Sequence, residues 1–283
     1  MRDLNWLRLG RDGLVILGVL AAVATWWTYT ATGTAVDAHF YWAADPHHLY
    51  PHPELAEQNG YNYSPAFEFV VGWGRLLPFE VFAGIWRAIL LVALVYLAGP
   101  FTLPVLVLWP VASEINAGNI QVLLALAVVA GFRYPGAWAF VLLSKVTPGL
   151  GLLWFLVRRE WRMVAIVAAT TGAFVAASLI FWADQWPDYL RLITSGKAPS
   201  VSPWYLPLWV RLPPAIAITV VAGLTGKRWP VVVAATLALP VFYTISPSML
   251  VGVLPFAREA LGRVMRDQGW SLERRTSSPE RRY

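Results

Sequence analysis

The chain has 283 residues, of which 58% are hydrophobic and only 13% are charged. Its mean hydropathy is +0.55, which excludes an ordinary soluble globular protein and indicates an integral membrane protein. Because the sequence has no cysteine, disulfides, thiolate nucleophiles and cysteine-ligated metals are excluded. The formal net charge of +6 lies mostly in short loops and at the termini, so it predicts membrane orientation and no nucleic-acid partner.

Apolar segments recur along the chain at lengths close to the ~20 residues that cross a bilayer. The first is too long for a signal peptide and lacks a clear small-residue cleavage site, so we expect a retained helix. The last two are short and meet at Ser246-Pro247. The sequence therefore predicts an all-α polytopic membrane protein with nine or ten transmembrane helices. The predicted spans are 12–31, 62–77, 80–98, 100–114, 117–132, 134–157, 162–183, 205–225, 229–245 and 247–257.

The basic residues predict how these spans are oriented in a plasma membrane. With a cytoplasmic N-terminus, most of them fall on the cytoplasmic side. The first outer loop, 32–61, and the second, 183–204, are then extracytoplasmic. We expect one transmembrane domain over residues 1–257 and a basic cytoplasmic tail over 258–283. The basic residues predicted on the cytoplasmic side before the tail are Arg2, Arg8, Arg11, Arg75, Arg158, Arg159, Arg162, Lys227 and Arg228, and those opposite are Arg133, Arg191 and Lys197.

The first outer loop concentrates titratable side chains and holds no Lys or Arg. Asp37 follows the first span closely, and a carboxylate partly desolvated at the membrane surface is a candidate general base. In a helix, Asp37 and Tyr41 would share one face at positions i and i+4. A helix cap or a solvated loop acid would explain Asp37 equally well, so spacing leaves its role open. The loop's histidines are His39, His47, His48 and His52, and its acids are Asp37, Asp45, Glu54 and Glu57.

A metal site in this loop is an alternative, with Asp45, His47, His48 and His52 as ligands. Two adjacent histidines do not easily bind the same ion, and the prolines around them stiffen the loop. The sequence therefore favours metal-independent chemistry, and we expect no metal and no other cofactor.

Several polar side chains interrupt the apolar spans, where they usually face a cavity or pair with one another. Glu68 and Arg87 are predicted to pair across neighbouring helices in a structural role, and Glu114 lies near the end of a span. Three amides surround a glycine within residues 115–121, where they either bridge helices or line a polar cavity.

Lys145 lies deep in the predicted span 134–157 without an acidic neighbour in sequence. A lysine at this depth needs a counter-ion, which a lipid phosphate would supply, or it snorkels to the interface. Near the second span, Ser64-Pro65 is typical of a helix start. The adjacent Tyr61 and Tyr63 either line a sugar-binding cleft or anchor the chain at the interface.

These motifs occur in an order that resembles glycosyltransferase family 87, the C-type, polyprenyl-phosphate-sugar-dependent mannosyltransferases and their relatives. The resemblance covers about residues 37–256. The matching segments are Asp37 to Tyr41, Leu49-Tyr50, Tyr63-Ser64-Pro65-Ala66-Phe67, Gly118-Asn119-Ile120-Gln121, Lys145-Val146-Thr147-Pro148 before the basic turn Arg158–Arg162, and Ser246-Pro247-Ser248.

The resemblance implies a C-type glycosyltransferase fold with a catalytic aspartate, here Asp37, in a large first outer loop. It implies an inverting hexosyltransferase that moves a sugar, with mannose favoured, from a polyprenyl-phosphate donor to a lipid or glycan hydroxyl on the extracytoplasmic side. Lys145 would lie near the donor phosphate, with Arg191 and Arg211 as further candidates. The candidates that line the acceptor or sugar are His39, Tyr41, Tyr63, Asn119 and Gln121.

Three departures from the family pattern bear on the acceptor. The amide motif reads Gly-Asn-Ile-Gln where the family usually has Gly-Gln-x-Asn, and Met249-Leu250-Val251 stands where relatives often have tryptophan and histidine. The chain is also short for the family. His39, His47 or His48 could substitute for the missing histidine.

A second function fits the same residues: a polyprenyl-phosphate or glycolipid carrier or flippase that performs no chemistry. Such a protein would need Lys145 and the arginines but not Asp37, so a substitution of Asp37 separates the two hypotheses. A purely structural membrane protein would not explain why polar residues gather on one side of the bilayer.

Overall fold

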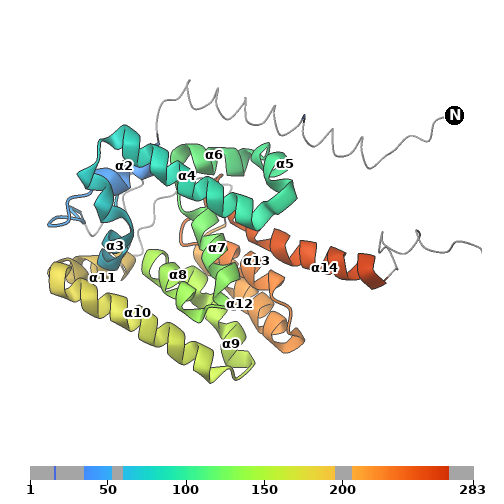
Figure 1. Cartoon of the computed structure of the whole chain (residues 1–283). Helices are drawn as coiled ribbons and strands as arrows, with labels where there is room; N and C mark the ends of the chain where they lie inside the picture. Colours follow the sequence, from blue (N-terminus) through green and yellow to red (C-terminus); the bar gives the residue numbers. More distant parts are fainter. Residues whose placement is uncertain (1–15, 17–34, 53–59, 195–205, 268–283) are drawn as a thin grey trace, which may run out of the picture.

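The computed structural model describes Ile16 and residues 35–52, 60–194 and 206–267. Every regular element in these ranges is helical, which confirms the predicted all-α class (Figure 1). The predicted first span, 12–31, lies outside the described residues apart from Ile16.

Three helical stretches in the described part of the chain are long and apolar enough to cross a membrane, and one bent pair would make a fourth. The pair is bent by 104°. These stretches confirm a polytopic membrane protein, although fewer helices are full-length than the nine or ten predicted spans. The long stretches are α4 (Phe79–Ala98) with η3 (Gly99–Phe101) and α5 (Thr102–Leu106), α10 (Trp161–Trp182) and α12 (Leu208–Thr225); the bent pair is α6 (Trp109–Ala117) and α7 (Gln121–Gly131).

Proline and glycine break other predicted spans into shorter helices. The predicted span 134–157 forms two antiparallel legs with Lys145 in extended conformation between them. A Cβ on Gly149 would meet Leu142, and one on Gly151 would meet Trp138, so the legs pack closely. The legs are η4 (Pro135–Ala137) with α8 (Trp138–Ser144), and η5 (Thr147–Leu152) with α9 (Leu153–Val157).

The C-terminal part of the bundle contains α13 (Trp229–Leu237), η6 (Ser246–Val253) and α14 (Leu254–Asp267). An irregular segment, 238–245, joins α13 to η6. α14 runs continuously across the predicted domain boundary at residue 257, and Figure 1 shows it projecting from the bundle.

The predicted second span, 62–77, does not cross the bundle. It consists of η1 (Pro65–Phe67), α3 (Glu68–Val71) and η2 (Gly72–Leu76), and both of its ends contact α2 (Val36–Ala43). The Tyr63 hydroxyl lies 3.0 Å from that of Tyr41, and Trp42 Nε1 donates to the Leu77 carbonyl at 2.9 Å. Because an eight-residue helix is only ~12 Å long, the segment enters and leaves on the same side.

This path corrects two sequence predictions. Arg75, assigned to the cytoplasmic side, lies beside the first outer loop and donates to the Ala44 carbonyl at 3.0 Å. The predicted Glu68–Arg87 pair is also wrong, because Glu68 pairs with Arg75, seven residues along the same segment. Arg87 instead donates to the Asn116 carbonyl at 2.8 Å.

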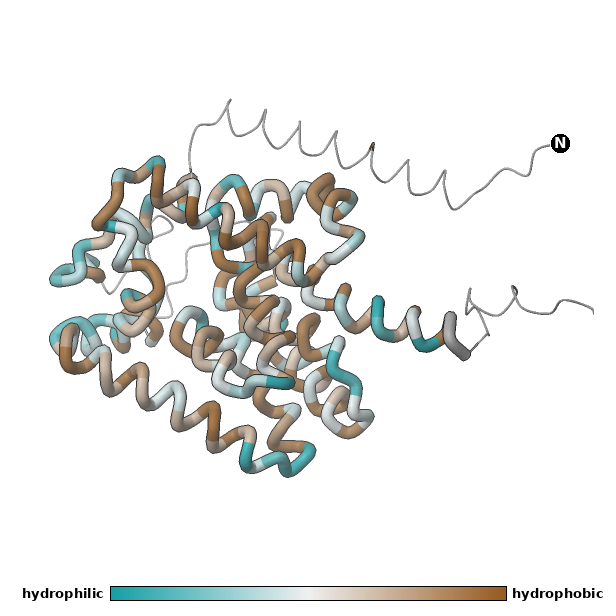
Figure 2. The backbone as a smooth tube through the Cα atoms, viewed as in Figure 1, coloured by the Kyte–Doolittle hydropathy of each residue, from teal (hydrophilic) through white to brown (hydrophobic). Residues whose placement is uncertain are grey.

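The opposite end of the bundle gathers basic loops around aromatic side chains. The ring of Phe132 lies 5.0 Å from Trp154 and 6.0 Å from Phe256, and the guanidinium of Arg228 lies 5.7 Å from its centre. Arg133 is next in sequence and therefore lies toward this basic end. This corrects the prediction that Arg133 lies on the side of the outer loops. Figure 2 shows hydrophilic residues at the turn between α9 and α10 and along α14.

Helix α11 (Gln185–Thr194) belongs to the second outer loop and contacts the first. The side chain of Gln185 accepts a hydrogen bond from the Leu49 backbone N–H at 3.0 Å and donates to the His47 carbonyl at 3.0 Å. The two outer loops that are far apart in sequence thus meet on the side that carries α2.

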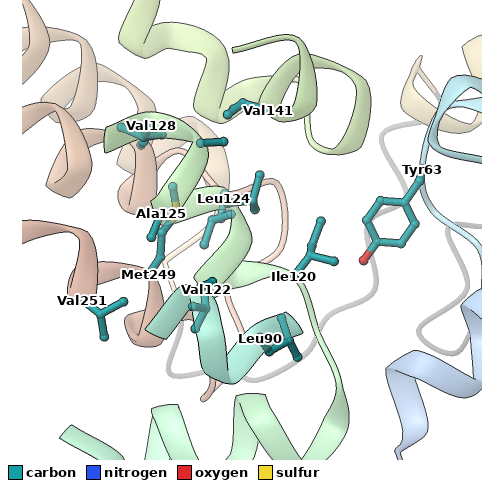
Figure 3. Packing of buried hydrophobic residues seen from close by; sticks show 14 of the residues in the cluster. Tyr63, Leu90, Ile120, Val122, Leu124, Ala125, Val128, Val141, Met249 and Val251 are labelled. Carbon is teal, nitrogen blue, oxygen red and sulfur yellow. The ribbon is translucent and has the colours of Figure 1, made fainter. Parts of the chain in front are cut away.

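The core surrounds α7, whose apolar side chains contact several elements (Figure 3). Val122, Ala125 and Val128 are buried, and η6 packs along α7 with Met249 and Val251. By contrast, only 11% of the apolar window of α10 is buried. An apolar helix so exposed faces lipid, so α10 forms an outer wall and α7 a central support.

Candidate functional site

Asp37 lies in the first turn of α2 and is half-buried. Its burial raises the pKa of the carboxyl, and this is the strongest influence; a hydrogen bond from the Asn119 side chain and the charge of Lys145 act in the opposite direction. Asp37 is therefore held in a partly desolvated position where two groups favour its charged form. Burial outweighs these two groups, so the pKa of Asp37 lies above its ordinary value.

A pocket of about 190 Å³ opens beside Asp37. This volume is below the roughly 300–1,000 Å³ of pockets that hold drug-sized ligands, so it fits about one sugar ring. Its lining combines polar groups that can orient hydroxyls with apolar side chains. The lining residues are Val36, Asp37, Phe40, Asn119, Tyr243, Thr244 and Ile245.

The turn between α6 and α7 supplies Asn119 to this pocket. Gly118 has a positive φ of 73°, and a Cβ there would lie 2.8 Å from that of Ala38. Glycine is needed both for the left-handed backbone and for the close approach to α2. Trp86 of α4 fixes the same turn by donating to the Gly118 carbonyl at 2.7 Å.

Lys145 approaches the site from the tip of the two antiparallel legs. Its ammonium group interacts electrostatically with both Glu114 and Asp37. The tip is fixed by Ser64, whose hydroxyl donates to the Leu143 carbonyl at 2.6 Å. The structure thus brings Asp37, Asn119 and Lys145 together from three elements that are distant in sequence.

The tyrosines predicted to line the sugar, Tyr41 and Tyr63, are not among the residues that line this pocket. The hydroxyls of Tyr41 and Tyr63 contact each other at 3.0 Å and both rings are buried. Burial is the main cause that raises the pKa of both phenols, so they stay neutral. Figure 3 shows the Tyr63 hydroxyl directed toward Ile120, at the start of α7. The contact between the two hydroxyls ties α2 to the segment just before η1.

Two further candidates are set apart from Asp37. His39 is exposed and packs against Phe79, with ring centres 5.2 Å apart. Gln121 is fully buried in the first turn of α7, and neither His39 nor Gln121 belongs to the residues that line the pocket beside Asp37.

The two candidate phosphate-binding arginines have other partners. Arg191 pairs with Asp188 at 3.1 Å on the exposed surface of α11. Arg211 donates to the carbonyls of Leu206 and Leu237 and lies 5.2 Å from the centre of the Phe242 ring. Arg211 thereby holds the segment 238–245, which lines the pocket.

The histidine-rich part of the first loop is largely exposed at its tip. Asp45 accepts a hydrogen bond from the His47 backbone N–H at 2.9 Å, which forms a local turn. Across the described residues, no group of three or more His, Asp or Glu is close enough to hold a metal ion.

Sequence reasoning missed part of the site. Tyr243 and Thr244 line the pocket but lie in an irregular segment without a motif. The sequence indicates Glu114 only as an acid near the end of an apolar span, and its electrostatic interaction with Lys145 is visible only in the folded chain.

Most residues of this site lie in a part of the chain that matches a known protein family. Residues 61–243 match the model of Glycosyltransferase family 87. The chain belongs to this family. The match includes Asn119, Lys145 and Tyr243 but begins after Asp37.

One curated relative comes from Mycolicibacterium smegmatis. It is a polyprenol-phosphate-mannose-dependent alpha-(1-2)-phosphatidylinositol pentamannoside mannosyltransferase. The two sequences are 30% identical over an alignment of 224 positions, and the alignment covers 67% of this chain and 54% of the relative. The chain thus spans about half the length of that relative. No solved structure matches the chain.

Proposed function

We propose that this family 87 protein is an inverting hexosyltransferase that moves a sugar from a polyprenyl-phosphate donor to a hydroxyl of a lipid or glycan acceptor. Mannose is the first sugar to test, because the mycobacterial relative is polyprenol-phosphate-mannose-dependent. The observation that carries the proposal is the Asp37 carboxylate, which lines a sugar-sized pocket together with Asn119 and lies near Lys145.

In the proposed reaction Asp37 accepts the proton of the acceptor hydroxyl. The hydroxyl oxygen attacks the anomeric carbon from the face opposite the phosphate, and the bond from that carbon to the phosphate oxygen breaks. Polyprenyl phosphate leaves with the bonding electrons, so inversion follows from a single displacement. The ammonium of Lys145 stabilises the leaving phosphate, which is the main electrostatic demand of the step.

The proposed topology places α2 and the pocket on the extracytoplasmic side of the plasma membrane, with the N-terminus in the cytoplasm. It is supported by the basic residues at the other end of the bundle, among them Arg158, Lys227 and Arg228. Arg133 belongs to that basic end, whereas Arg75 lies beside the first outer loop, so these two corrections leave the predicted asymmetry of charge unchanged.

The chemistry proposed here uses no metal ion or other cofactor, because a phosphate leaving group needs a cation and Lys145 provides one. Purified protein in lipid vesicles, supplied with a glycolipid acceptor fraction, tests the donor class directly. We expect transfer from polyprenyl-phosphate mannose, no transfer from a nucleotide sugar, and full activity in excess chelator. Transfer from the nucleotide sugar alone, or loss of activity on chelation, would overturn the proposal.

A further inference from the structure

Glu114 is a fully buried acid on the last turn of α6. Its Oε1 atom accepts hydrogen bonds from the backbone N–H groups of Gln121, at 2.5 Å, and Val122, at 3.3 Å. These are the first two residues of α7. The side chain of Glu114 therefore binds the N-terminus of the helix that follows its own.

The first N–H groups of a helix have no partner within it, and a carboxylate there gains from both hydrogen bonding and the helix dipole. The backbone of Glu114 contributes as well, because its carbonyl accepts from the N–H groups of Gly118, at 3.0 Å, and Asn119, at 3.3 Å. The side chain and the backbone carbonyl of Glu114 thus both hold the turn between α6 and α7.

This turn determines where Asn119 points. Asn119 Oδ1 accepts from the Ile120 backbone N–H at 2.6 Å, so its amide nitrogen remains to donate to Asp37. Hydrogen bonds and the short backbone between them thus connect Glu114 with Asn119 and, through the Asn119 side chain, with the proposed general base.

We propose that Glu114 is a positioning residue for sugar transfer, which acts by fixing the turn that holds Asn119 against Asp37. This inference rests on the proposed role of Asp37 as general base. In this proposal the position of the Glu114 side-chain oxygen matters and its negative charge does not. The oxygen must bind the N-terminus of α7 for the turn to keep its shape.

Three substitutions separate geometry from charge. Glu114→Gln keeps a side-chain oxygen of the same reach but removes the charge. Glu114→Asp keeps the charge but is one methylene shorter, so its oxygen withdraws from the N–H of Gln121. Glu114→Ala removes both. Glu80→Gln, an exposed acid in the first turn of α4, is the matched control.

The full-length variants are assayed in vesicles for kcat, for the KM of polyprenyl-phosphate mannose and for the pH profile of kcat/KM. A displacement of about 1 Å in a catalytic group costs about 10²-fold in rate, so we expect kcat to fall by ~10- to 100-fold in Glu114→Asp and Glu114→Ala. The donor KM should stay within about threefold in Glu114→Asp, because this variant keeps the negative charge that interacts with Lys145. Glu114→Gln should retain kcat within about fivefold.

The pH profile reports on Asp37 itself. The groups that interact with its charge are Lys145, Glu114, Tyr41, Tyr63 and Tyr243. In Glu114→Asp the hydrogen bond from Asn119, which lowers the pKa of Asp37, is lost, so the acidic limb moves to higher pH. A residue that only stabilised the fold would lower the amount of active protein and leave this limb in place.

The proposal is overturned if Glu114→Gln is as impaired as Glu114→Asp, if Glu114→Asp turns over normally, or if its acidic limb does not move. If Glu114→Ala does not fold, the comparison of Glu114→Gln with Glu114→Asp still tests the proposal. If the unsubstituted protein transfers no sugar at all, the proposed function itself is refuted.

Discussion

The proposed chemistry depends on opposing influences on a single carboxyl group, that of Asp37. Burial favours the neutral form of Asp37, whereas the amide of Asn119 and the ammonium of Lys145 favour the charged form. A general base must be charged to accept a proton, yet desolvation makes it a stronger base. The arrangement supplies both conditions and allows each neighbour to be tested separately.

Asn119→Ala should move the acidic limb of activity to higher pH. In the proposed reaction Asp37 accepts a proton only when ionised, so activity should be lost as the pH falls through its pKa. The hydrogen bond from Asn119 lowers that pKa, so its removal should raise the pKa and move the limb with it. The measurement is kcat/KM against pH, with the surface variant Asn62→Ala as control. An unchanged limb would show that Asn119 does not act on Asp37.

Lys145→Met should weaken donor binding and transfer. A charge-assisted hydrogen bond to phosphate is worth about 1.5–3 kcal/mol, so we expect kcat/KM for the donor to fall by ~10- to 100-fold. Lys145→Arg should retain more activity than Met because it keeps the charge. Lys227→Met, at the basic end of the bundle, is the control, and equal activity of Lys145→Met and the unsubstituted protein would refute the phosphate role.

Residue type alone was a good guide to part of this site. An intramembrane lysine is rare and costly, so Lys145 could be singled out from the sequence, whereas Asp37 is one of four acids in its loop and only the family resemblance distinguished it. The sequence predicts that Tyr41 and Tyr63 line the acceptor or sugar, and in the structure their hydroxyls contact each other. Amphipathic side chains such as tyrosine suit a pocket and a buried support equally, and only packing distinguishes the two.

At the scale of elements, hydropathy found the apolar segments but not their paths. Residues 62–77 are apolar enough for a span, yet Pro65 and two glycines divide them into short helices that return to α2. The same applies to residues 134–157, which fold into two legs around Lys145. A window of average hydropathy does not distinguish a crossing from a re-entrant segment, because both bury apolar side chains.

The path of residues 62–77 can be tested with single cysteines, since the natural chain has none. Asn62→Cys and Glu80→Cys should react with a membrane-impermeant maleimide from the same side, because both ends of the segment lie against α2. Lys227→Cys, in the exposed turn before α13, should react only from the opposite side. Labelling of Asn62→Cys and Glu80→Cys from opposite sides would show that the segment crosses the membrane.

The geometry of the α6–α7 turn predicts that a substitution of Gly118 lowers the stability of the protein. Gly118→Ala places a Cβ 2.8 Å from that of Ala38 on a backbone with positive φ, so the free energy of unfolding should fall by roughly 1–3 kcal/mol. Gly172→Ala in α10, where nothing lies within 4 Å of the new Cβ, is the control. Thermal unfolding in detergent measures both, and equal stability of the two variants would contradict the described turn.

For the whole molecule, the helices give the bundle two distinct ends. α10, with 22 residues, is ~33 Å long and can cross the membrane, whereas α7, with 11 residues, covers only ~16 Å. α7 therefore supports the site from within the bundle. The outer loops and α2 form one end, and the basic turns form the other. The all-α class followed from composition, whereas this division depended on contacts between distant segments.

The central claim is that Asp37 performs chemistry, and Asp37→Asn tests it most directly. The substitution keeps the shape of the side chain but removes its basicity. Transfer from polyprenyl-phosphate mannose is measured in vesicles with full-length protein, and Asp45→Asn in the same loop is the control. We predict that Asp37→Asn folds normally and loses about 10²–10⁴-fold in turnover, while Asp45→Asn stays active. Undiminished transfer by Asp37→Asn would contradict the account.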